Sequence, residues 1–406
     1  MRALLFSNLF PTSADPNRGL FTRQLAAEIG RLCDLEVAVP LPWFPSNQLA
    51  AKLAPAYARN FGAIAPRLDW NGIPAIYPRY PLIPKISERA HDRLMYFGVR
   101  RAIAAAHRRA PFDVINAHWL YPDGAVAARL GAMLGVPVVL TALGCDVNVD
   151  LEHPLKRAHI LAAARSAAAV TAVSQPLADR LEAAGVPRDK LHVIPNGVDT
   201  IRFAPRDRDA SRRALGLADA PLVVCVSRLS HEKGVDVLVD AARALRARIP
   251  AARVAVVGDG AEHAALDQRI AASGLTDVVQ LVGAMPHEAV PTWMSAADVV
   301  CMPSRREGHP NAAMEALACG RPLVASRAGA LTALVTAARG ITVEPGDSAA
   351  LAVALATALT RSWDAEAIAA SVRDDSWGRA AQGYVHVYRA AIDAALPAAA
   401  GNIISI

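Results

Sequence analysis

Short apolar runs alternate with longer Ala-rich segments along the whole chain. Each run is apolar at nearly every position, which is typical of strands covered on both faces in a parallel sheet, whereas the longer segments have helical periodicity. This alternation predicts parallel sheets joined by right-handed crossovers. In the first half the predicted strands are 3–7, 35–39, 112–116, 137–141 and 168–173, and the predicted helices are 19–31, 85–109 and 125–134.

The second half repeats the pattern, and turn-forming residues at 195–199 and 205–209 separate the two halves. The chain is therefore predicted to be an α/β protein of two Rossmann-like, doubly wound domains, residues 1–203 and 204–375, that face a central cleft. Ligands of such sheets bind beyond the carboxyl ends of the strands, so we expect the active site in this cleft. The predicted strands of the second domain are 222–227, 253–257, 278–282, 299–302 and 323–325.

The length of 406 residues suits two hydrophobic cores better than one, and a composition of 53% hydrophobic and 20% charged residues excludes a disordered chain. The most apolar window, 161–178, is interrupted by polar residues such as Arg165 and Pro176, so no membrane-spanning helix is predicted. Residues 1–7 enter a predicted strand without a signal-peptide pattern. The five cysteines lie far apart with no Cys-x-x-Cys pair. We expect a cytoplasmic protein without a disulfide framework or a zinc site.

The net charge of +6 lies entirely in the first half. Residues 1–200 contain 22 Lys and Arg against 16 Asp and Glu, whereas residues 201–406 contain 21 of each. The predicted helix 85–109 is basic, and it is either a solvated helix packed on its own domain or a surface for an anionic membrane. No other segment resembles a nucleic-acid-binding module, so no nucleic acid partner is expected. The apolar stripe predicted for this helix is Ile86, Leu94, Phe97 and Ile103.

Two glutamates separated by seven residues form the most specific candidate site. Glu307 lies in a Gly/Pro loop, and Glu315 lies about one turn inside the helix that this loop opens. An isolated pair of this kind is more often a helix-start acid and a surface acid. Free amides at a helix start suit an anionic or polyhydroxyl ligand, and a carboxylate beside them can accept hydrogen bonds from sugar hydroxyls.

Two cations and a glycine precede this pair and change its interpretation. Arg228 and Lys233 follow the predicted strand 222–227, where a pyrophosphate would need neutralising. Gly258 follows the next strand and allows close approach of the backbone to a ligand. No Asp-x-Asp motif or histidine cluster with metal-ligand spacing occupies a plausible site, so we expect no metal. The set favours a site for a ligand that carries both a pyrophosphate and sugar hydroxyls.

Taken in order, these segments resemble the retaining family 4 glycosyltransferases of the GT-B fold, and the resemblance covers nearly the whole chain. It implies that a C-terminal helix, 376–395, crosses back onto the first domain, and it leaves 396–406 as a tail without assigned function. The further motifs that carry the resemblance are Ala117-His-Trp-Leu-Tyr-Pro-Asp-Gly124, Gly144-Cys-Asp146, Val193-Ile-Pro-Asn-Gly-Val-Asp199 and the segment beginning Ser376-Trp.

The resemblance implies a role for each candidate residue. Arg228 and Lys233 would hold the donor diphosphate, Glu315 the ribose hydroxyls, and Glu307 the transferred sugar. The first domain would contribute Gly19, which would approach the diphosphate, and His118 with Asp146, which would face the sugar. For His118, its position alone fits a hydrogen-bonded histidine at a strand end equally well, and the motif around it favours the functional role. The remaining donor contacts implied are Gly258, Met285, Gly308, Asn311 and Ala312.

Two loops depart from the family pattern, and both departures bear on the acceptor or on loop details. Leu143 stands where many relatives carry the histidine of His-Gly-x-Asp, and the loop 328–332 lacks the proline and the acid that are common after the glutamate pair. The residues implied to bind the donor are unaffected.

The implied reaction is transfer of a hexosyl group with retention of anomeric configuration, without a cofactor or metal. UDP-glucose, UDP-N-acetylglucosamine and GDP-mannose are the candidate donors, and the expected acceptor is lipid-linked or a polysaccharide in cell-surface glycan synthesis. The alternatives are another two-Rossmann enzyme, such as a nucleotide-sugar epimerase or a phosphorylase, and a non-catalytic sugar-nucleotide-binding protein. We expect the enzyme in the cytoplasm, peripheral at the inner face of the plasma membrane through residues 85–109.

Overall fold

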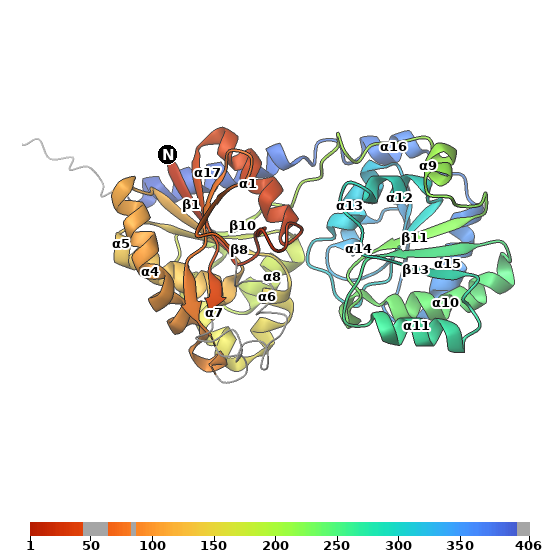
Figure 1. Ribbon diagram of the computed structural model, residues 1–406, viewed down its shortest axis with the longest axis horizontal. Helices are drawn as coiled ribbons and strands as arrows, with labels where there is room; N and C mark the ends of the chain where they lie inside the picture. Colours follow the sequence, from red (N-terminus) through yellow and green to blue (C-terminus); the bar gives the residue numbers. More distant parts are fainter. Residues whose placement is uncertain (44–63, 83–86, 396–406) are drawn as a thin grey trace, which may run out of the picture. The chain divides into compact units, whose positions relative to one another are not determined.

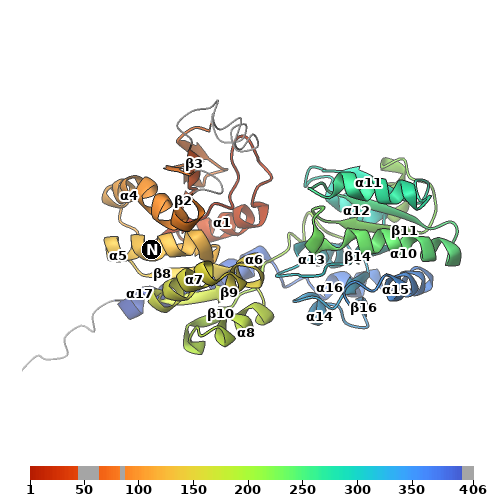
Figure 2. The ribbon, with the colours of Figure 1, turned by 90° about the horizontal axis from the view of Figure 1, so that it is seen from below.

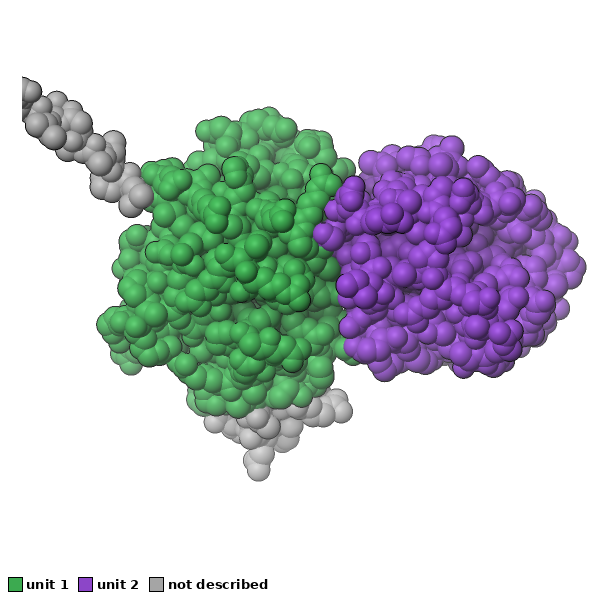
Figure 3. Space-filling view, turned by 90° about the horizontal axis from the view of Figure 1, so that it is seen from above, with its two compact units in different colours: residues 1–195, 377–406 green, residues 196–376 purple. Residues whose placement is uncertain are grey.

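The computed structural model describes residues 1–43, 64–82 and 87–395, shown in two views in Figures 1 and 2. The chain forms two compact units, coloured in Figure 3: unit 1 contains Met1–Pro195 and Trp377–Ile406, and unit 2 contains Asn196–Ser376. The boundary therefore lies before the predicted residue 203. Phe203 is buried in a core of unit 2, and the Val198 amide donates to the Asp375 carbonyl at 2.8 Å, so the connecting segment already belongs to the second unit.

An eight-stranded sheet forms the centre of unit 1, in the order β10-β9-β8-β7-β1-β2-β5-β4. All described neighbours in it are parallel except β4 and β5. The prediction of a parallel sheet is confirmed, while β10, β4, β5 and the separate β3-β6 pair were not predicted. The strands are β1 Arg2–Phe6, β2 Asp34–Ala38, β3 Leu41–Trp43, β4 Arg67–Asp69, β5 Pro74–Ile76, β6 Arg79–Pro81, β7 Val114–His118, β8 Val138–Ala142, β9 Ala169–Ala172 and β10 Leu191–Val193.

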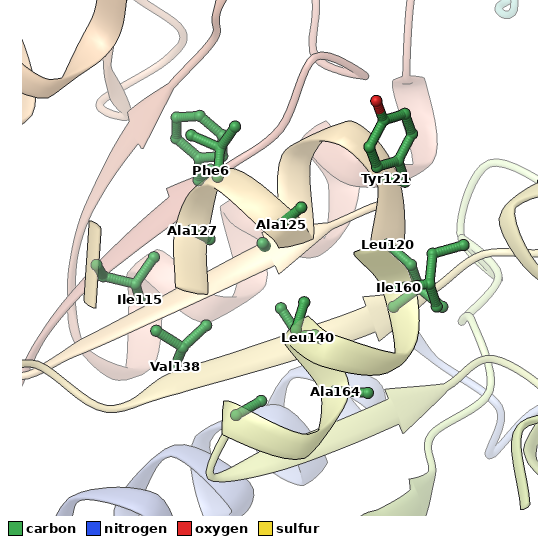
Figure 4. Close-up of a cluster of buried hydrophobic side chains, with 14 of the residues drawn as sticks. Phe6, Ile115, Leu120, Tyr121, Ala125, Ala127, Val138, Leu140, Ile160 and Ala164 are labelled. Atoms are coloured by element: carbon green, nitrogen blue, oxygen red, sulfur yellow. The ribbon is translucent and has the colours of Figure 1, made fainter. Parts of the chain in front are cut away.

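Helices cover both faces of this sheet, and successive strand residues enter opposite cores. Ala3 and Leu5 pack with α1 and α17, whereas Leu4 and Phe6 pack with α4, α5, α7 and α8. Figure 4 shows part of the second of these cores. The C-terminal α17 lies against α1 and belongs to unit 1. The main helices are α1 Leu20–Leu32, α4 His91–Arg109, α5 Ala125–Leu134, α6 Cys145–Asn148, α7 Pro154–Ser166, α8 Gln175–Ala183 and α17 Trp377–Ala395, with short turns η1 Glu88–Ala90, η2 Leu120–Gly124, η3 Asp150–Glu152 and η4 Arg188–Lys190.

Unit 2 contains a six-stranded parallel sheet in the order β13-β12-β11-β14-β15-β16, which confirms the second doubly wound domain. The sheet is again covered on both faces, since Val223 and Leu222 of one strand enter different cores. Its strands are β11 Leu222–Val226, β12 Arg253–Val257, β13 Val279–Gly283, β14 Val299–Met302, β15 Leu323–Ser326 and β16 Gly340–Val343, and its helices are α9 Arg208–Ala214, η5 His231–Lys233, α10 Val235–Arg248, α11 His263–Ala272, α12 Val290–Ala296, α13 Asn311–Ala318, α14 Leu331–Leu334, α15 Ser348–Thr360 and α16 Ala365–Ala370.

Strand order locates the ligand-binding edge of this sheet. The strand β11 has β12 on one side and β14 on the other, so the connections that leave β11 and β14 run to opposite sides. Ligands of open α/β sheets bind at such a switch point, beyond the carboxyl ends of the strands. The loops that follow β11 and β14 are therefore the first place to look for a site.

The apolar stripe predicted for α4 is wrong. The buried apolar residues of the helix are Met95, Val99, Ile103 and Ala106, whereas Phe97 is 58% exposed. The observed stripe follows helical spacing from Met95, and of the predicted residues only Ile103 belongs to it; Ile86 lies outside the described residues. None of the described helices combines the length and apolar character needed to cross a bilayer.

Candidate functional site

The loops after β11 and β14 approach each other so closely that one position admits only glycine. Gly234 ends the first loop with a φ of 63°, and a Cβ atom there would lie 2.1 Å from the carbonyl oxygen of Pro303 in the second loop. Both the positive φ and the contact exclude other residues. The loop that carries Lys233 is thus in direct contact with the loop that leads to Glu307.

Lys233 and Glu307 form an ion pair at this contact. The Lys233 Nζ atom lies 2.7 Å from Glu307 Oε2, and the Ser304 hydroxyl donates to the same oxygen at 3.1 Å. Glu307 is only 8% exposed, so its carboxylate depends on these partners rather than on water. The structure therefore brings together Lys233 and Glu307, which were predicted on separate motifs. The third predicted residue, Arg228, follows β11 and has an exposed side chain.

A second cation, which sequence reasoning missed, holds the two loops together. Arg305 donates through both terminal nitrogens to the Asp236 carboxylate, at 2.7 and 2.6 Å, and to the His231 carbonyl at 2.9 Å. Its own amide donates to the Glu232 carbonyl. The guanidinium lowers the pKa of the Asp236 carboxyl, mainly through this hydrogen bond. Arg305 therefore positions the turn that carries Lys233.

Glu315 lies in the second turn of α13 and is held by another residue that was not predicted, His287. The His287 Nε2 atom lies 3.1 Å from Glu315 Oε1, and its Nδ1 atom lies 3.0 Å from Nη1 of Arg202. Both side chains of the first pair remain slightly exposed, 13% for His287 and 16% for Glu315. The loop between β13 and α12 thus reaches the predicted ribose-binding carboxylate.

The remaining predicted donor contacts of unit 2 lie around the same edge of the sheet. A Cβ atom on Gly258 would lie 1.9 Å from the Ser227 carbonyl oxygen, so the loops after β11 and β12 are in contact through a glycine with a φ of 138°. Asn311 accepts a hydrogen bond from Asn196 at 3.0 Å. The half-buried Met285 and Ala312 pack against one core, and Gly308 lies in the loop before α13.

In unit 1, His118 is the last residue of β7 and is almost completely buried. Its Nε2 atom lies 3.0 Å from Asn116 Oδ1, which also accepts from the Tyr388 hydroxyl of α17 at 2.8 Å. Desolvation lowers the pKa of His118 to about 3, so its imidazole is neutral at ordinary pH. The Nδ1 atom is buried without a hydrogen-bond partner among the described residues. The histidine is thus available as a neutral hydrogen-bonding group.

Asp146 and Gly19 each have a structural explanation within unit 1. The Asp146 carboxylate accepts from the backbone amides of Leu120, Leu143 and Gly144, and it thereby ties together the loops after β7 and β8. Desolvation raises its pKa to about 6 in spite of these hydrogen bonds. Gly19 has a φ of 59°, and a Cβ atom there would lie 2.2 Å from a backbone oxygen of the preceding loop. These contacts leave a ligand-binding role for either residue as a prediction.

A buried carboxylate that the sequence analysis passed over lies at the same edge of unit 1. Asp123 accepts from the backbone amide and the side-chain amide of Asn8, at 2.6 and 2.7 Å, and burial raises its pKa to about 8. Within the described ranges, no group of three or more His, Cys, Asp or Glu side chains is arranged to hold a metal ion.

Comparison with known proteins identifies two family regions that together span most of the chain. Residues 207–374 match the glycosyl transferases group 1 model, and residues 53–202 match the glycosyltransferase family 4 model. A Bacillus subtilis protein named as the teichuronic acid biosynthesis glycosyltransferase TuaC is 30% identical over 87% of this chain and 88% of its own. The D-inositol 3-phosphate glycosyltransferase of Geodermatophilus obscurus is 33% identical over 71% of this chain and 69% of its own.

Solved structures agree with this assignment at the level of the fold. Sucrose-phosphate synthase from Thermosynechococcus elongatus has a TM-score of 0.75 at 21% identity, and covers 97% of this chain and 100% of its own. Anabaena HepE in complex with UDP and glucose has a TM-score of 0.71 at 23% identity, and covers 95% and 99%. The chain has the GT-B fold of two Rossmann-like domains and belongs to the family 4 glycosyltransferases, enzymes that use nucleotide-sugar donors.

Proposed function

We propose that this enzyme transfers a hexosyl group with retention at the anomeric carbon and without a metal ion. The observation that carries the proposal is the pair of Lys233 and Glu307, joined at 2.7 Å at the switch point of the unit 2 sheet, with Glu315 on the helix that follows. A cation, a sugar-binding carboxylate and a ribose-binding carboxylate are the groups that a nucleotide-sugar needs.

In this proposal Arg228 and Lys233 neutralise the donor diphosphate, and their effect grows as the leaving diphosphate gains charge in the transition state. Glu307 accepts hydrogen bonds from the transferred sugar, and Glu315 accepts them from the ribose. The first turn of α13 supports the sugar through amides near Asn311. The lesser contacts, on the family resemblance alone, are Gly258, Met285, Gly308 and Ala312 in unit 2 and Gly19, His118 and Asp146 in unit 1.

We propose no cofactor, and the donor remains one of UDP-glucose, UDP-N-acetylglucosamine and GDP-mannose. The HepE structure with UDP and glucose supports a uridine donor, whereas a Mycolicibacterium smegmatis relative is named as GDP-mannose-dependent. Selectivity for one base and one sugar depends on pocket shape. A thermal-shift screen over these nucleotide sugars distinguishes them, since the true donor stabilises the fold most at equal concentration.

The acceptor that we propose is a lipid-linked saccharide or polysaccharide in cell-surface glycan synthesis. The similarity to the B. subtilis teichuronic acid protein supports it. The test is incubation of the enzyme with radiolabelled nucleotide sugars and lipids extracted from bacterial membranes. We expect label in the lipid fraction. Release of label only as free sugar, or epimerised donor without transfer, would contradict the proposal in favour of a hydrolase or an epimerase.

We also propose that the enzyme binds an anionic membrane at its cytoplasmic face, and one surface of unit 1 supports this proposal. Phe97 is 58% exposed and Met133 41% exposed, and Tyr96 lies between them, with its ring 5.5 Å from Phe97 and its hydroxyl 3.7 Å from the Met133 sulfur. The Arg100 guanidinium lies 4.9 Å from the Phe97 ring, and Arg93, Arg101 and Arg108 are exposed on the same helix. Aromatic and apolar side chains among arginines suit the interface of an anionic bilayer, where each arginine contributes about 1 kcal/mol.

Vesicle co-sedimentation tests this surface. Arg93, Arg100, Arg101 and Arg108 are changed together to Glu; Arg109 is left intact because it lies 3.7 Å from the buried Glu36. The matched control makes the same four charge reversals at exposed arginines of unit 2, Arg213, Arg243, Arg248 and Arg373. We expect wild type and control to sediment with anionic vesicles at low salt and the first variant to remain in solution. Equal sedimentation of all three proteins would contradict the membrane proposal and leave the transferase untouched.

A further inference from the structure

His287 has no assigned role in the proposed reaction, yet it contacts the proposed ribose-binding carboxylate. It lies in the loop between β13 and α12, with Nε2 at 3.1 Å from Glu315 Oε1 and Nδ1 at 3.0 Å from Arg202 Nη1. The Phe203 ring packs edge-on against it, with the centroids 5.3 Å apart. The imidazole is therefore enclosed by a cation, a carboxylate and an aromatic ring.

The contact with Arg202 determines which imidazole nitrogen carries the proton. A guanidinium can only donate hydrogen bonds, so Nδ1 of His287 has to accept, and the single proton of the neutral ring lies on Nε2. That nitrogen faces Glu315 and donates to it. A doubly protonated imidazolium would place an N–H against the arginine N–H, and the alternative neutral tautomer would place a lone pair against the carboxylate.

Arg202 is itself fixed by acids on two sides. Its Nε atom lies 3.7 Å from Asp199 Oδ2, and its Nη1 atom lies 3.4 Å from Glu288 Oε1. The segment 196–203 that carries Arg202 is anchored in unit 2 by the buried Phe203. A continuous series of contacts thus links the two acids, Arg202, His287 and Glu315. Arg202 donates to His287, and His287 donates to Glu315.

We infer that His287 is a positioning residue that orients Glu315 for the hydroxyls of the donor ribose. By occupying Oε1, it leaves Oε2 to accept from the ligand, since no described residue donates to that oxygen. A carboxylate that is already oriented loses less freedom on binding and so binds its ligand more tightly. This inference rests on the proposed function, in which Glu315 binds the ribose.

The test compares a nucleoside diphosphate with its 2′,3′-dideoxy counterpart, which lacks the hydroxyls that Glu315 would bind. The probe is whichever of UDP, GDP and ADP binds wild type most tightly by calorimetry. Wild type should prefer the ribose form by about tenfold or more, as expected for hydrogen bonds to a charged group. His287→Phe keeps the ring and the contact with Phe203 but cannot donate, and it should lose about tenfold of that preference while binding the dideoxy form within about twofold of wild type.

Two further variants make the result specific. His287→Gln retains an N–H donor and should recover part of the preference. His263→Phe is the matched control in the same unit, because the His263 side chain has no hydrogen bond among the described residues, and it should behave as wild type. An unchanged ribose preference in His287→Phe, or an equal loss of affinity for both ligands, would overturn the inference while the proposed function stands. A wild type without any preference would overturn the ribose role of Glu315 and the inference with it.

Discussion

The replacement of Lys233 by alanine tests the core of the proposed site, because it affects both stability and ligand binding. Lys233 is the cationic partner of Glu307, and the only other hydrogen bond to that carboxylate given by the described residues comes from the Ser304 hydroxyl at 3.1 Å. Glu307 is 8% exposed. Without Lys233 a nearly buried negative charge remains, supported by one neutral donor.

The expected cost follows from that geometry. A hydrogen bond to a charged group contributes about 1.5 to 3 kcal/mol, and an unpaired buried charge costs at least as much. We use the range of about 1.5 to 3 kcal/mol without adding the cost of the unpaired charge, because the Lys233 side chain is 20% exposed and water can partly replace it. For a domain of this size each kcal/mol shifts Tm by about 2 to 4 °C, so we expect Tm to fall by about 3 to 12 °C.

The assay separates the two roles of Lys233 by a second substitution. Calorimetry and thermal denaturation are measured for Lys233→Ala, for the double variant Lys233→Ala with Glu307→Gln, and for Arg269→Ala, which removes the exposed ion pair with Asp240 as a control. The double variant has no buried charge and should recover most of the lost Tm. Both variants at Lys233 should bind a nucleoside diphosphate about tenfold to a hundredfold more weakly. Unchanged nucleotide affinity would refute the placement of Lys233 on the diphosphate, and a double variant as unstable as the single one would refute the buried-charge argument.

Four further predictions address other parts of the account. Replacing Glu315 by Ala should weaken nucleotide binding by about 1.5 to 3 kcal/mol in calorimetry, with the fold intact by circular dichroism. Transfer activity should survive EDTA, and full inhibition that magnesium or manganese reverses would contradict the metal-independent proposal. Arg305→Met should raise the KM for the donor, since it releases the turn that carries Lys233, although among the described residues the Arg305 guanidinium donates only to the Asp236 carboxylate and the His231 carbonyl. Burial lowers the pKa of His118 to about 3 in the folded protein, below its ordinary 6.5, so the stability that His118 contributes is present above pH 6.5 and is lost as the pH falls towards 3. In urea denaturation, the free energy of unfolding should therefore fall less on acidification for His118→Asn than for wild type.

The two sheets could be predicted from the chain because their central strands are buried on both faces. Runs such as Arg253–Val257 and Val299–Met302 are apolar at nearly every position, and the structure confirms both with the predicted limits. The strands that were missed are short and lie near sheet edges or outside the main sheets. Leu191–Val193, for example, has an exposed central histidine, so its sequence contains no apolar run from which a strand could be predicted.

The orientation of α4 could not be read in the same way. Apolar residues occur around much of this helix, and both Leu94 and Met95 offer a starting point for a helical stripe. Packing into the core of unit 1 selects Met95, Val99 and Ile103, and the helix also buries Asp92, which pairs with Arg129 at 2.9 Å. The composition of the helix predicted a basic surface, but only the tertiary contacts determine which hydrophobic residue lies outside.

The candidate site divides along similar lines. Motif residues that follow strands, such as Lys233 and Glu307, could be placed at one sheet edge from topology, although their 2.7 Å contact could not. The residues that orient the site lie far in sequence from the carboxylates that they contact. His287 is 28 positions from Glu315, and Arg305 is 69 positions from Asp236, so their pairing depends on the path of the loops. Charged residues in loops at the carboxyl end of a strand were the available signal.

The central claim is that the switch-point loops of unit 2 hold the donor through its diphosphate and ribose. The most direct measurement is calorimetric titration of the full chain with the nucleoside diphosphate of its preferred donor. Wild type is compared with Lys233→Ala, Glu315→Ala and the exposed control Arg269→Ala. The account predicts that both site variants lose about tenfold or more in affinity while the control binds as wild type does. Equal affinity in wild type and both site variants, with all proteins folded, would contradict it.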